Sequence, residues 1–431
     1  MSDATSGAPA DGLSDDPDAD PHGDRALSGR FAALSVREFR RLWWGGIFVF
    51  LASQAQQVAR GWLAYDLTGS NKGLGGVIFG FGVSSLIAVP SAGVIADRFP
   101  KRRIMMWAQT AMGAAALGIA IAVATDTIEY WMLIAASVVQ GSGVSMLAPA
   151  RLAMTAELVD RRILTNAIFL SNGSIQATRV LGPVVAGVLI AVEPVGIGGV
   201  YFLGAALAAL SLVATAGLPP GNPRGSSGRT PLGDLADGIN YVRNRPELKR
   251  LLIIGVLVIM FGYPHITFLP GMIQDVYVLD AWALGVLTGA AAVGAVGASL
   301  FLANVETRRL SSLQFKAGVM FGVSLIGFAA VPQYWGGVLV MVIVGGASSA
   351  FQSMNNSQAL VIADVEYHGR VQSLLMLAFT GFGLMALPMG LLADSLGIRE
   401  TMAGMGLVVG ACVLAGDYWR RRQPQPDIPD L

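Results

Sequence analysis

The sequence predicts an all-α membrane protein in which twelve helices cross a bilayer as two six-helix bundles. Of its 431 residues, 54% are hydrophobic and only 13% are charged, which is too apolar for a soluble protein of this length. Apolar runs of about 20 residues, the length that crosses hydrocarbon, recur from Arg41 onward. Lysine and arginine gather in alternate connections between these runs, as they do in multi-pass proteins.

The segment before the first span, residues 1–30, is rich in Asp, Pro, Gly, Ala and Ser and has no apolar periodicity. Such a composition predicts a disordered, cytoplasmic N-terminus. Because it lacks the basic start of a cleaved signal peptide, we expect the first membrane helix to act as the targeting signal.

The apolar runs divide into two groups. We expect an N-terminal bundle within residues 31–218, a cytoplasmic linker at 219–249, a C-terminal bundle at 250–419 and a cytoplasmic tail at 420–431. In the linker, apolar residues at helical spacing between charges predict an amphipathic helix on the inner leaflet. The expected spans are about 42–66, 73–96, 104–124, 131–150, 164–191, 197–217, 250–270, 283–303, 313–331, 335–357, 371–393 and 400–419.

Positive charge sets the expected topology. The segments that would be outside hold only Lys72 and Arg399. This bias predicts that both termini are cytoplasmic in the inner or plasma membrane. The segments that would be inside hold Arg37, Arg40, Arg41, Arg98, Lys101, Arg102, Arg103, Arg161, Arg162, Arg243, Arg245, Lys249, Arg250, Arg308, Arg309, Arg370, Arg420, Arg421 and Arg422.

One short segment, residues 93–103, separates the second and third spans. It holds the carboxylate of Asp97 and four cations, which cannot sit in hydrocarbon and therefore predict a tight cytoplasmic hairpin. Taken alone, it could be a positive-inside anchor after any second helix. Its pattern Gly-x-x-x-Asp-Arg-x-x-(Lys/Arg)-Arg, however, resembles the loop 2–3 signature of the major facilitator superfamily, with Pro100 where the family usually has Gly.

The resemblance extends from about Phe31 to Arg422. Within the superfamily, the sequence is similar to the subgroup that includes enterobactin exporters and macrolide efflux proteins. The resemblance implies two bundles that rock around a midplane cavity, a small-molecule substrate and protons as the coupling ion. It also implies that Asp97 interacts with Arg151 and with the start of the eleventh helix. We also expect a monomer. The motifs include Gln56-Gln57-Val58-Ala59, Pro149-Ala150-Arg151, Arg179-Val180-Leu181-Gly182-Pro183, Arg243-Asn244-Arg245-Pro246 and Gly369-Arg370-Val371. The candidate gating residues are Gly93, Asp97, Arg98, Lys101, Arg102, Arg151, Gly182 and Pro183.

Two arginines within the predicted spans, Arg60 and Arg179, are candidate substrate contacts. An arginine in the bilayer costs about 2.5–3.5 kcal/mol, so each must face protein or a wet cavity. Bracing of neighbouring helices is the alternative for both, and for Arg60 we favour the cavity. The arginines lie on polar stripes with Ser53, Gln56 and Gln57 in the first span and with Asn172 and Gln176 in the fifth.

Further candidate contacts come from three other spans. Gln352, Asn355 and Asn356 form a broad polar face in the tenth span, and Gln140 lies in the fourth. These polar faces could equally hold helices together. His265, between two prolines, could titrate or satisfy a backbone carbonyl that the prolines free. The glycines of the eighth span, Gly285 among them, predict close packing rather than a site.

Several functions are excluded or disfavoured by residue type. The sequence has no ATP-binding Gly-rich loop, no multi-Cys metal site, no nucleic-acid patch and only three scattered histidines, so we expect no enzyme, metal or cofactor. No Asp or Glu lies near the middle of a span, so the residues do not supply the carboxylate that proton coupling commonly uses. We therefore expect an exporter of a siderophore-like, drug-like or other amphipathic solute. An importer of the same fold and a non-transporting receptor or scaffold are the alternatives.

The uncompensated positive charge suggests the chemistry of the substrate. A permanent cation in a low-dielectric cavity attracts an anion. Our hypothesis is that Arg60 contacts an acidic oxygen group, with hydrogen bonds from Gln56, Gln57 and Asn355.

Overall fold

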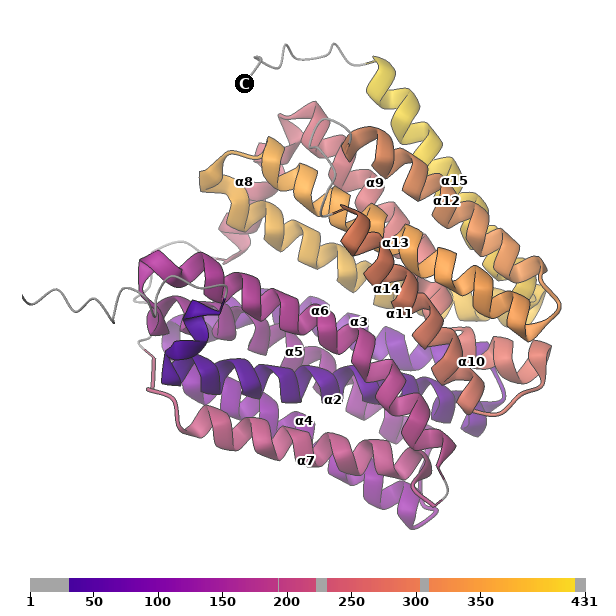
Figure 1. Ribbon diagram of the computed structural model, residues 1–431, viewed down its shortest axis with the longest axis horizontal. Coiled ribbons are helices and arrows are strands. Elements are labelled where there is room, and N and C mark those ends of the chain that lie inside the picture. Colours follow the sequence, from indigo (N-terminus) through magenta and orange to yellow (C-terminus); the bar gives the residue numbers. More distant parts are fainter. Residues whose placement is uncertain (1–30, 193, 222–230, 303–309, 423–431) are drawn as a thin grey trace, which may run out of the picture.

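The computed structural model describes residues 31–192, 194–221, 231–302 and 310–422. Within these ranges every regular element is a helix, and twelve long helical segments run from one end of the molecule to the other (Figure 1). Ten of the described helices are long and apolar enough to cross a membrane, and a shorter apolar stretch, Gly381–Leu396, belongs to a further one. The predicted all-α fold with twelve crossing helices is confirmed.

The helices form two halves. The first half consists of η1 (Ala32–Ser35), α2 (Arg37–Thr68), α3 (Asn71–Arg98), α4 (Lys101–Ala124), α5 (Tyr130–Leu158), α6 (Arg161–Ala191) and α7 (Gly196–Ala216). The linker segment contains α8 (Pro231–Arg243). The second half consists of α9 (Pro246–Gly262), η2 (Tyr263–Ile266), α10 (Leu269–Gly271), η3 (Met272–Tyr277), α11 (Trp282–Leu302), α12 (Leu310–Ala330), α13 (Tyr334–Ile362), η5 (Val365–Tyr367), α14 (His368–Leu396) and α15 (Ile398–Arg422).

Two ends of the molecule follow from this order. We call the end that holds α8 and the turn between α3 and α4 the linker end, and the opposite end the distal end. At the linker end only Phe99 and Pro100 separate α3 from α4, so the expected tight hairpin is present. At the distal end, Gly69 stops α2 with a left-handed φ of 55°, which glycine adopts without strain. Ser70 then caps α3 by accepting a hydrogen bond from the Gly73 N–H at 3.2 Å.

The seventh crossing segment is broken where the sequence places Pro264. Helix α9 ends at Gly262 and is followed by a 3₁₀ turn, a single α-turn and a π-helical turn that ends at Tyr277. Proline removes a backbone donor and clashes with the preceding turn, which favours a break in the helix at this point. The segment is longer than the span predicted from hydropathy, and part of its backbone is not α-helical.

The two halves repeat one interaction at the linker end. In the first half, Arg41 of α2 donates to the carbonyl of Gly217, just after α7, at 2.8 Å. In the second half, Arg250 of α9 donates to the carbonyl of Gly416 in α15 at 3.5 Å. In each half, the first crossing helix is hydrogen-bonded to the last crossing helix or to the residue just after it, as expected for parallel repeats.

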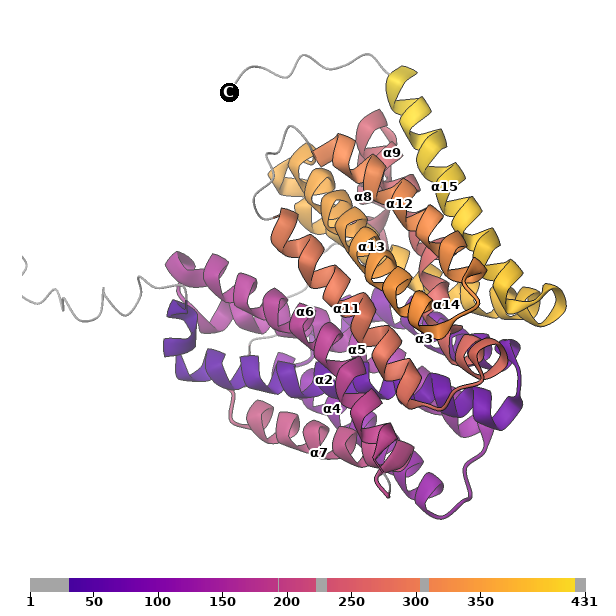
Figure 2. The same ribbon diagram turned by 45° about the vertical axis from the view of Figure 1, so that its right-hand side comes forward.

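Among the described residues, apolar packing joins the halves at the distal end only. One buried cluster contains residues of both halves, including Leu74 and Val77 of α3 with Phe268, Met272 and Leu284. The described clusters nearer the linker end each contain residues of one half, and one of them also contains residues of α8. Accordingly, the halves converge toward the distal end, at the right of Figure 1, and diverge toward α8 in both views (Figure 2). The structure is therefore closed at the distal end.

Glycines allow the closest approaches between the halves. A Cβ atom built on Gly285 of α11 would lie 2.6 Å from the Cα atom of Gly187 in α6, which no real side chain tolerates. Gly82 of α3 and Gly383 of α14 meet in the same way. The predicted close packing of Gly285 is confirmed, and its partner belongs to the other half.

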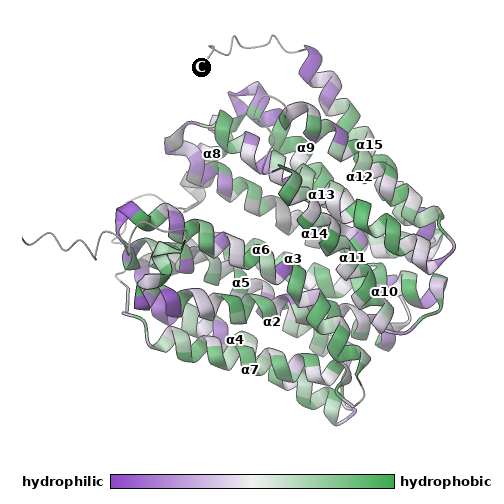
Figure 3. Ribbon diagram, in the orientation of Figure 1, coloured by the Kyte–Doolittle hydropathy of each residue, from purple (hydrophilic) through white to green (hydrophobic). Residues whose placement is uncertain are grey.

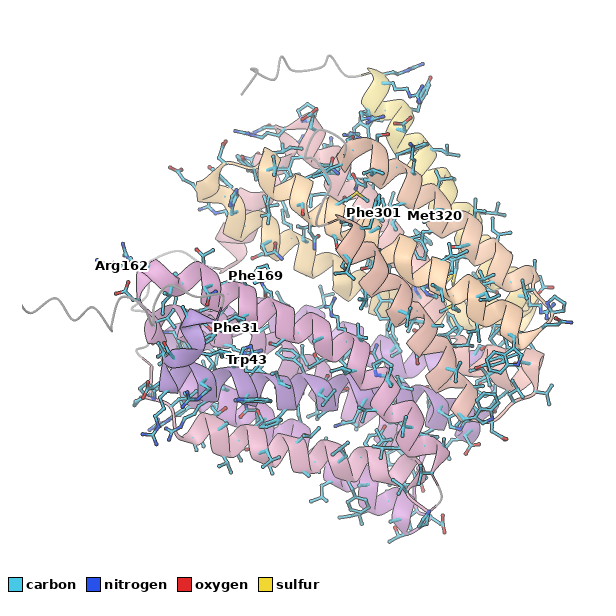
Figure 4. All side chains as sticks on the ribbon, in the orientation of Figure 1. Phe31, Trp43, Arg162, Phe169, Phe301 and Met320 are labelled. Carbon is cyan, nitrogen blue, oxygen red and sulfur yellow. The ribbon has the colours of Figure 1, made fainter. Side chains whose placement is uncertain are left out.

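Apolar side chains cover the outside of the helices, as expected for a protein surrounded by lipid. Figure 3 shows hydrophobic residues along the helices and hydrophilic ones concentrated near α8 and the end of α15. Phe169, Phe301 and Met320, labelled in Figure 4, are exposed on helices of both halves. Trp43 is half-buried within the first half, where its indole donates to the Leu170 carbonyl at 3.1 Å.

Candidate functional site

A cation of the first half faces a tyrosine of the second. Arg179 lies in the middle part of α6, about 18 Å from its distal end at 1.5 Å per residue, and its side chain is exposed. Its charge interacts electrostatically with Tyr263, at the break after α9. Because Arg179 is exposed and interacts with the opposite half, it faces the space between the halves rather than lipid. Asn172, seven residues earlier on the same face, is also exposed.

The break in the seventh segment shapes this region. The Tyr263 hydroxyl donates to the Ser348 carbonyl of α13 at 3.3 Å, which fixes the ring beside the break. His265 is buried, its Nδ1 lies 2.7 Å from the Gly262 carbonyl, and its ring packs against Phe321. In this conformation His265 therefore satisfies a carbonyl near Pro264 and is not presented to the space between the halves.

The polar residues of α2 separate onto two faces. Gly61 lies against Pro270 of the second half, and Gln57, one turn earlier and half-buried, shares that face. Gln56 is buried against Gly204 of α7, inside the first half. The sequence stripe that grouped Gln56 with Gln57 therefore splits, and only Gln57 is directed toward the second half.

Arg60 lies in the interior of the first half. Only 2% of it is exposed, and its guanidinium donates to Ser137 Oγ at 3.0 Å and to Gln140 of α5. Gln140 in turn donates to Ser53 Oγ at 2.6 Å. The Tyr201 hydroxyl of α7 interacts electrostatically with the Arg60 guanidinium. Arg60 and Gln140 therefore brace α2 against α5, which was the alternative to facing a cavity.

The polar face of α13 also has two parts. Asn355 is fully buried, accepts a hydrogen bond from Gln314 Nε2 at 2.9 Å and packs against Gly255 of α9. Gln352 donates to Asn356 at 3.0 Å, and both follow Ser348 at spacings of four residues. Gln352 and Asn356 therefore continue the face that receives the Tyr263 hydroxyl, whereas Asn355 holds helices together.

The hairpin residues hold the linker end of the first half together. Lys101, with 1% of its side chain exposed, forms an ion pair with Glu157 at the end of α5. Arg102 donates to the Leu218 carbonyl at 2.8 Å, so the hairpin also fixes the chain after α7. Arg98 is exposed. The side chains of Gly93, Asp97 and Gln176 lie outside the described residues.

Arg151 is the most unusual cation of the described chain. It is 4% exposed, its guanidinium lies over the Phe50 ring at 5.5 Å and against Gly46, and none of its three guanidinium nitrogens has a hydrogen-bond partner among the described residues. A buried, unpaired charge is costly, so this position calls for an anionic partner.

Gly182 and Pro183 lie in α6 one turn beyond Arg179. Gly182 packs directly on the backbone of α2 at Gln54 and Ala55. Pro183 stands inside the helix without ending it. Together they fix how α6 crosses α2, and thereby where Arg179 is held.

Two polar contacts between the halves were not anticipated from the sequence. Asp394, at the end of α14, accepts hydrogen bonds from the backbone N–H groups of Asn71 and Lys72 at 2.7 and 2.9 Å. The Tyr65 hydroxyl of α2 donates to Asp275 of η3 at 2.5 Å. The only signal was the stretch Gly390-Leu-Leu-Ala-Asp394, which repeats the spacing of Gly93 and Asp97. Within the described ranges, no group of three His, Cys, Asp or Glu side chains could hold a metal ion.

Comparison with known proteins agrees with this architecture. The sequence matches the family described as "Transmembrane secretion effector" over residues 28–426. The chain belongs to this family of major facilitator superfamily transporters. It is therefore a multi-pass membrane transporter and not an enzyme.

Curated relatives of this transporter match most of its length at low identity. It is 24% identical to the staphyloferrin A transporter of Staphylococcus aureus over 87% of this chain and 94% of the relative. Identity is 23% to the enterobactin exporter EntS of Citrobacter koseri, covering 81% of this chain and 84% of the relative. With macrolide efflux protein A of Streptococcus pyogenes the identity is 26%, covering 86% and 93%.

Solved structures share the transporter fold. A bacterial homologue of the human lysosomal transporter Spinster, in an inward-facing and occupied conformation, aligns with a TM-score of 0.73 at 12% identity. The alignment covers 89% of this transporter and 96% of that chain. The nucleoside transporter NupG aligns with a TM-score of 0.66 at 12% identity, covering 90% of this transporter and 100% of that chain. At these identities the likeness concerns the fold alone.

Proposed function

We propose that this transporter exports a small organic molecule with an anionic group by alternating access. The observation that carries the proposal is the placement of Arg179 opposite Tyr263, between halves that are packed together at one end and apart at the other. The names of the relatives, which include an exporter and an efflux protein, support export of a siderophore-like or drug-like solute.

In the proposed orientation the linker end is cytoplasmic and the distal end faces outward. The support is the charge bias: arginines gather at the linker end, whereas Lys72 and Arg399 belong to the distal end. The structure would then be the inward-facing state, able to receive a substrate from the cytoplasm. The halves within 31–218 and 250–419 would rock about the central region to open the distal end.

Closure of the linker end would use the hairpin. We assign Asp97 as the partner of Arg151 and of the N-terminus of α14 in the outward-facing state. The unpaired guanidinium of Arg151 supports this assignment because it requires a carboxylate. Lys101 and Arg102, already bound to α5 and to the chain after α7, would hold the hairpin in place for that contact.

The substrate would be held by groups from both halves. Arg179 would bind its acidic oxygens, since a guanidinium offers a planar fork that matches a carboxylate or phosphate. Gln57 and Asn172 from the first half, and Tyr263, Gln352 and Asn356 from the second, would add hydrogen bonds. Arg60 would act indirectly by bracing α2 against α5. This indirect role replaces the direct contact between Arg60 and the substrate that the sequence suggested.

The coupling ion in the proposal is the proton, acting at the distal carboxylates Asp275 and Asp394. Both accept hydrogen bonds that bridge the halves at the distal end, so they are placed to respond when that end opens. This arrangement needs no carboxylate in the middle of a span. We further propose that a single chain performs the cycle, because both halves belong to it.

The test begins with a thermal-shift screen of the purified protein against metabolite, siderophore and drug panels, since a ligand stabilises the state it binds. Counterflow of each ligand found is then measured in proteoliposomes. Vectorial flux into inverted vesicles, or out of right-side-out vesicles, would show export, whereas the opposite flux would show import. Binding without counterflow would contradict transport and favour a receptor or scaffold.

A further inference from the structure

A cavity of about 30 Å³ lies at the linker end of the second half, between α9, α12, α13 and α15. This volume accommodates about two water-sized groups. Arg420 lines it, and 36% of the Arg420 side chain is exposed. The polar residues that line it are Arg250, Ser311, Gln314, Asp417 and Arg420.

The cavity carries a crowded set of positive charges. Arg420 and Arg421 share one carboxylate: Arg420 Nη2 lies 2.5 Å from Asp417 Oδ1, and Arg421 Nε lies 2.8 Å from Oδ2. Arg250, only 8% exposed, is attracted by Glu247 and Asp417 but repelled by Arg420. Three arginines thus face two carboxylates.

The buried arginine is incompletely satisfied. Arg250 reaches the Gly416 carbonyl only at 3.5 Å, and its Nε has no hydrogen-bond partner within the described ranges. Its counterpart in the first half, Arg41, makes the same bond to Gly217 at 2.8 Å. The second half therefore keeps a buried donor available at a cavity, where the first half makes a short bond.

The remaining lining suits an anion with several oxygens. Ser311 Oγ lies 2.7 Å from Arg420 Nη1, so a hydroxyl and a guanidinium are side by side in the lining. Beside them, exposed Tyr418 lies 4.4 Å under the Arg422 guanidinium, an aromatic and cationic pair typical of the membrane interface. Arginine forks match phosphate oxygens, and basic pockets between membrane helices bind anionic headgroups.

We propose that this cavity receives two oxygens of a phosphate group whose remainder lies outside it, and that the source of the phosphate is the headgroup of an anionic phospholipid. Phosphate oxygens would enter between Arg250 and Arg420 and accept from Ser311, while the acyl chains would lie along the exposed faces of α12 and α15. The bound lipid would fix the linker end of the second half. The site is separate from the region around Arg179, and the proposal does not depend on the direction of transport.

The experiment is native mass spectrometry of the full chain released from detergent with phosphatidylglycerol, phosphatidylcholine or diacylglycerol. Wild type should retain phosphatidylglycerol most tightly and diacylglycerol least. Arg420→Gln should weaken phosphatidylglycerol binding at least about ten-fold, as expected for the loss of a charge-assisted hydrogen bond. Ser311→Ala should weaken it less. The matched control is Arg421→Gln, which removes the same charge from the next residue but does not line the cavity, and should cost no more than the general attraction of one interfacial arginine, about five-fold.

Each other outcome overturns part or all of the proposal. Equal losses in Arg420→Gln and Arg421→Gln would show general attraction to basic residues and reject a built site. Displacement of the lipid by millimolar inorganic phosphate, with the same thermal stabilisation of the protein, would assign the cavity to free phosphate. Equal retention of all three lipids would reject phosphate recognition. Arg250→Gln adds a second readout, since a folded variant that keeps full binding would also contradict the assignment.

Discussion

The carboxylate of Asp394, at the end of α14, accepts a hydrogen bond of 2.7 Å from the backbone N–H of Asn71, the first residue of α3. The N–H of Lys72 donates to the other carboxylate oxygen at 2.9 Å. The first backbone N–H groups of a helix have no partner within it, and they carry partial positive charge. Asp394 therefore caps a helix of the other half, and the cap exists only while the distal end is closed.

Asp394→Asn should shift the protein toward the distal-open state. A carboxylate at a helix N-terminus contributes about 1 kcal/mol, so its loss changes the ratio of the two states about five-fold. The measurement is the labelling rate of a cysteine at Gln57 by an impermeant thiol reagent added at the distal side, in a Cys412→Ala background. Asp126→Asn, exposed at the same end with a left-handed φ that Asn tolerates, is the control and should label as the parent does.

Gly285→Ala should impair closure of the distal end. Its methyl group would lie 2.6 Å from Gly187 Cα, on the backbone of α6, and backbone cannot move aside as a side chain can. We expect transport to fall at least about ten-fold, equivalent to about 1.4 kcal/mol against the closed state and within the range for overpacking. Gly289→Ala, one turn away on α11 and 3.8 Å from a Val184 methyl, should retain normal counterflow. Similar defects in both variants would mean that α11 tolerates no added volume, whatever its partner.

Arg179→Gln should weaken anionic ligands much more than neutral ones. A charge-assisted hydrogen bond contributes about 1.5–3 kcal/mol, so affinity for an anion should fall by one to two orders of magnitude. Arg179→Lys keeps the charge but loses the planar fork and should be intermediate. Calorimetric titration with ligands from the screen measures this. If every ligand lost affinity equally, Arg179 would be a structural residue of α6.

Arg60→Gln is the matched comparison, because it removes the other mid-span cation of the first half. Breaking its bonds to Ser137 and Gln140 should lower stability by about 1–3 kcal/mol, seen as a lower thermal midpoint. Affinities for anionic and neutral ligands should change alike. Selective loss of anionic ligands would restore a direct role for Arg60.

The fold could be predicted because each of its signals is local. Apolar runs give the crossing helices, and the charges at residues 93–103 give the hairpin. The orientation of individual polar side chains could not be predicted in the same way. Gln56 and Gln57 differ by about 100° around α2, and period alone does not say which face meets the second half. The structure turns Gln56 toward α7 and leaves Gln57 on the face that meets Pro270.

Contacts between the halves could not be predicted from the sequence, for a related reason. Asp394 and Asn71 are 323 residues apart, and nothing in either local pattern names the other. Arg60 and Arg179 are both mid-span cations, and the sequence favoured a cavity-facing role for Arg60 but not for Arg179. They differ because α5 supplies Ser137 and Gln140 to one, whereas α6 holds the other opposite the break at Pro264.

The central claim is that the two halves rock, exchanging a closed distal end for a closed linker end. The most direct test is a pair of spin-label distances in liposomes, between Lys72 and Ser395 at the distal end and between Arg162 and Asn244 at the linker end. Relative to the parent protein, the Gly285→Ala variant should show a longer distal distance and a shorter linker-end distance. Lengthening of both distances, or movement of neither, would contradict it.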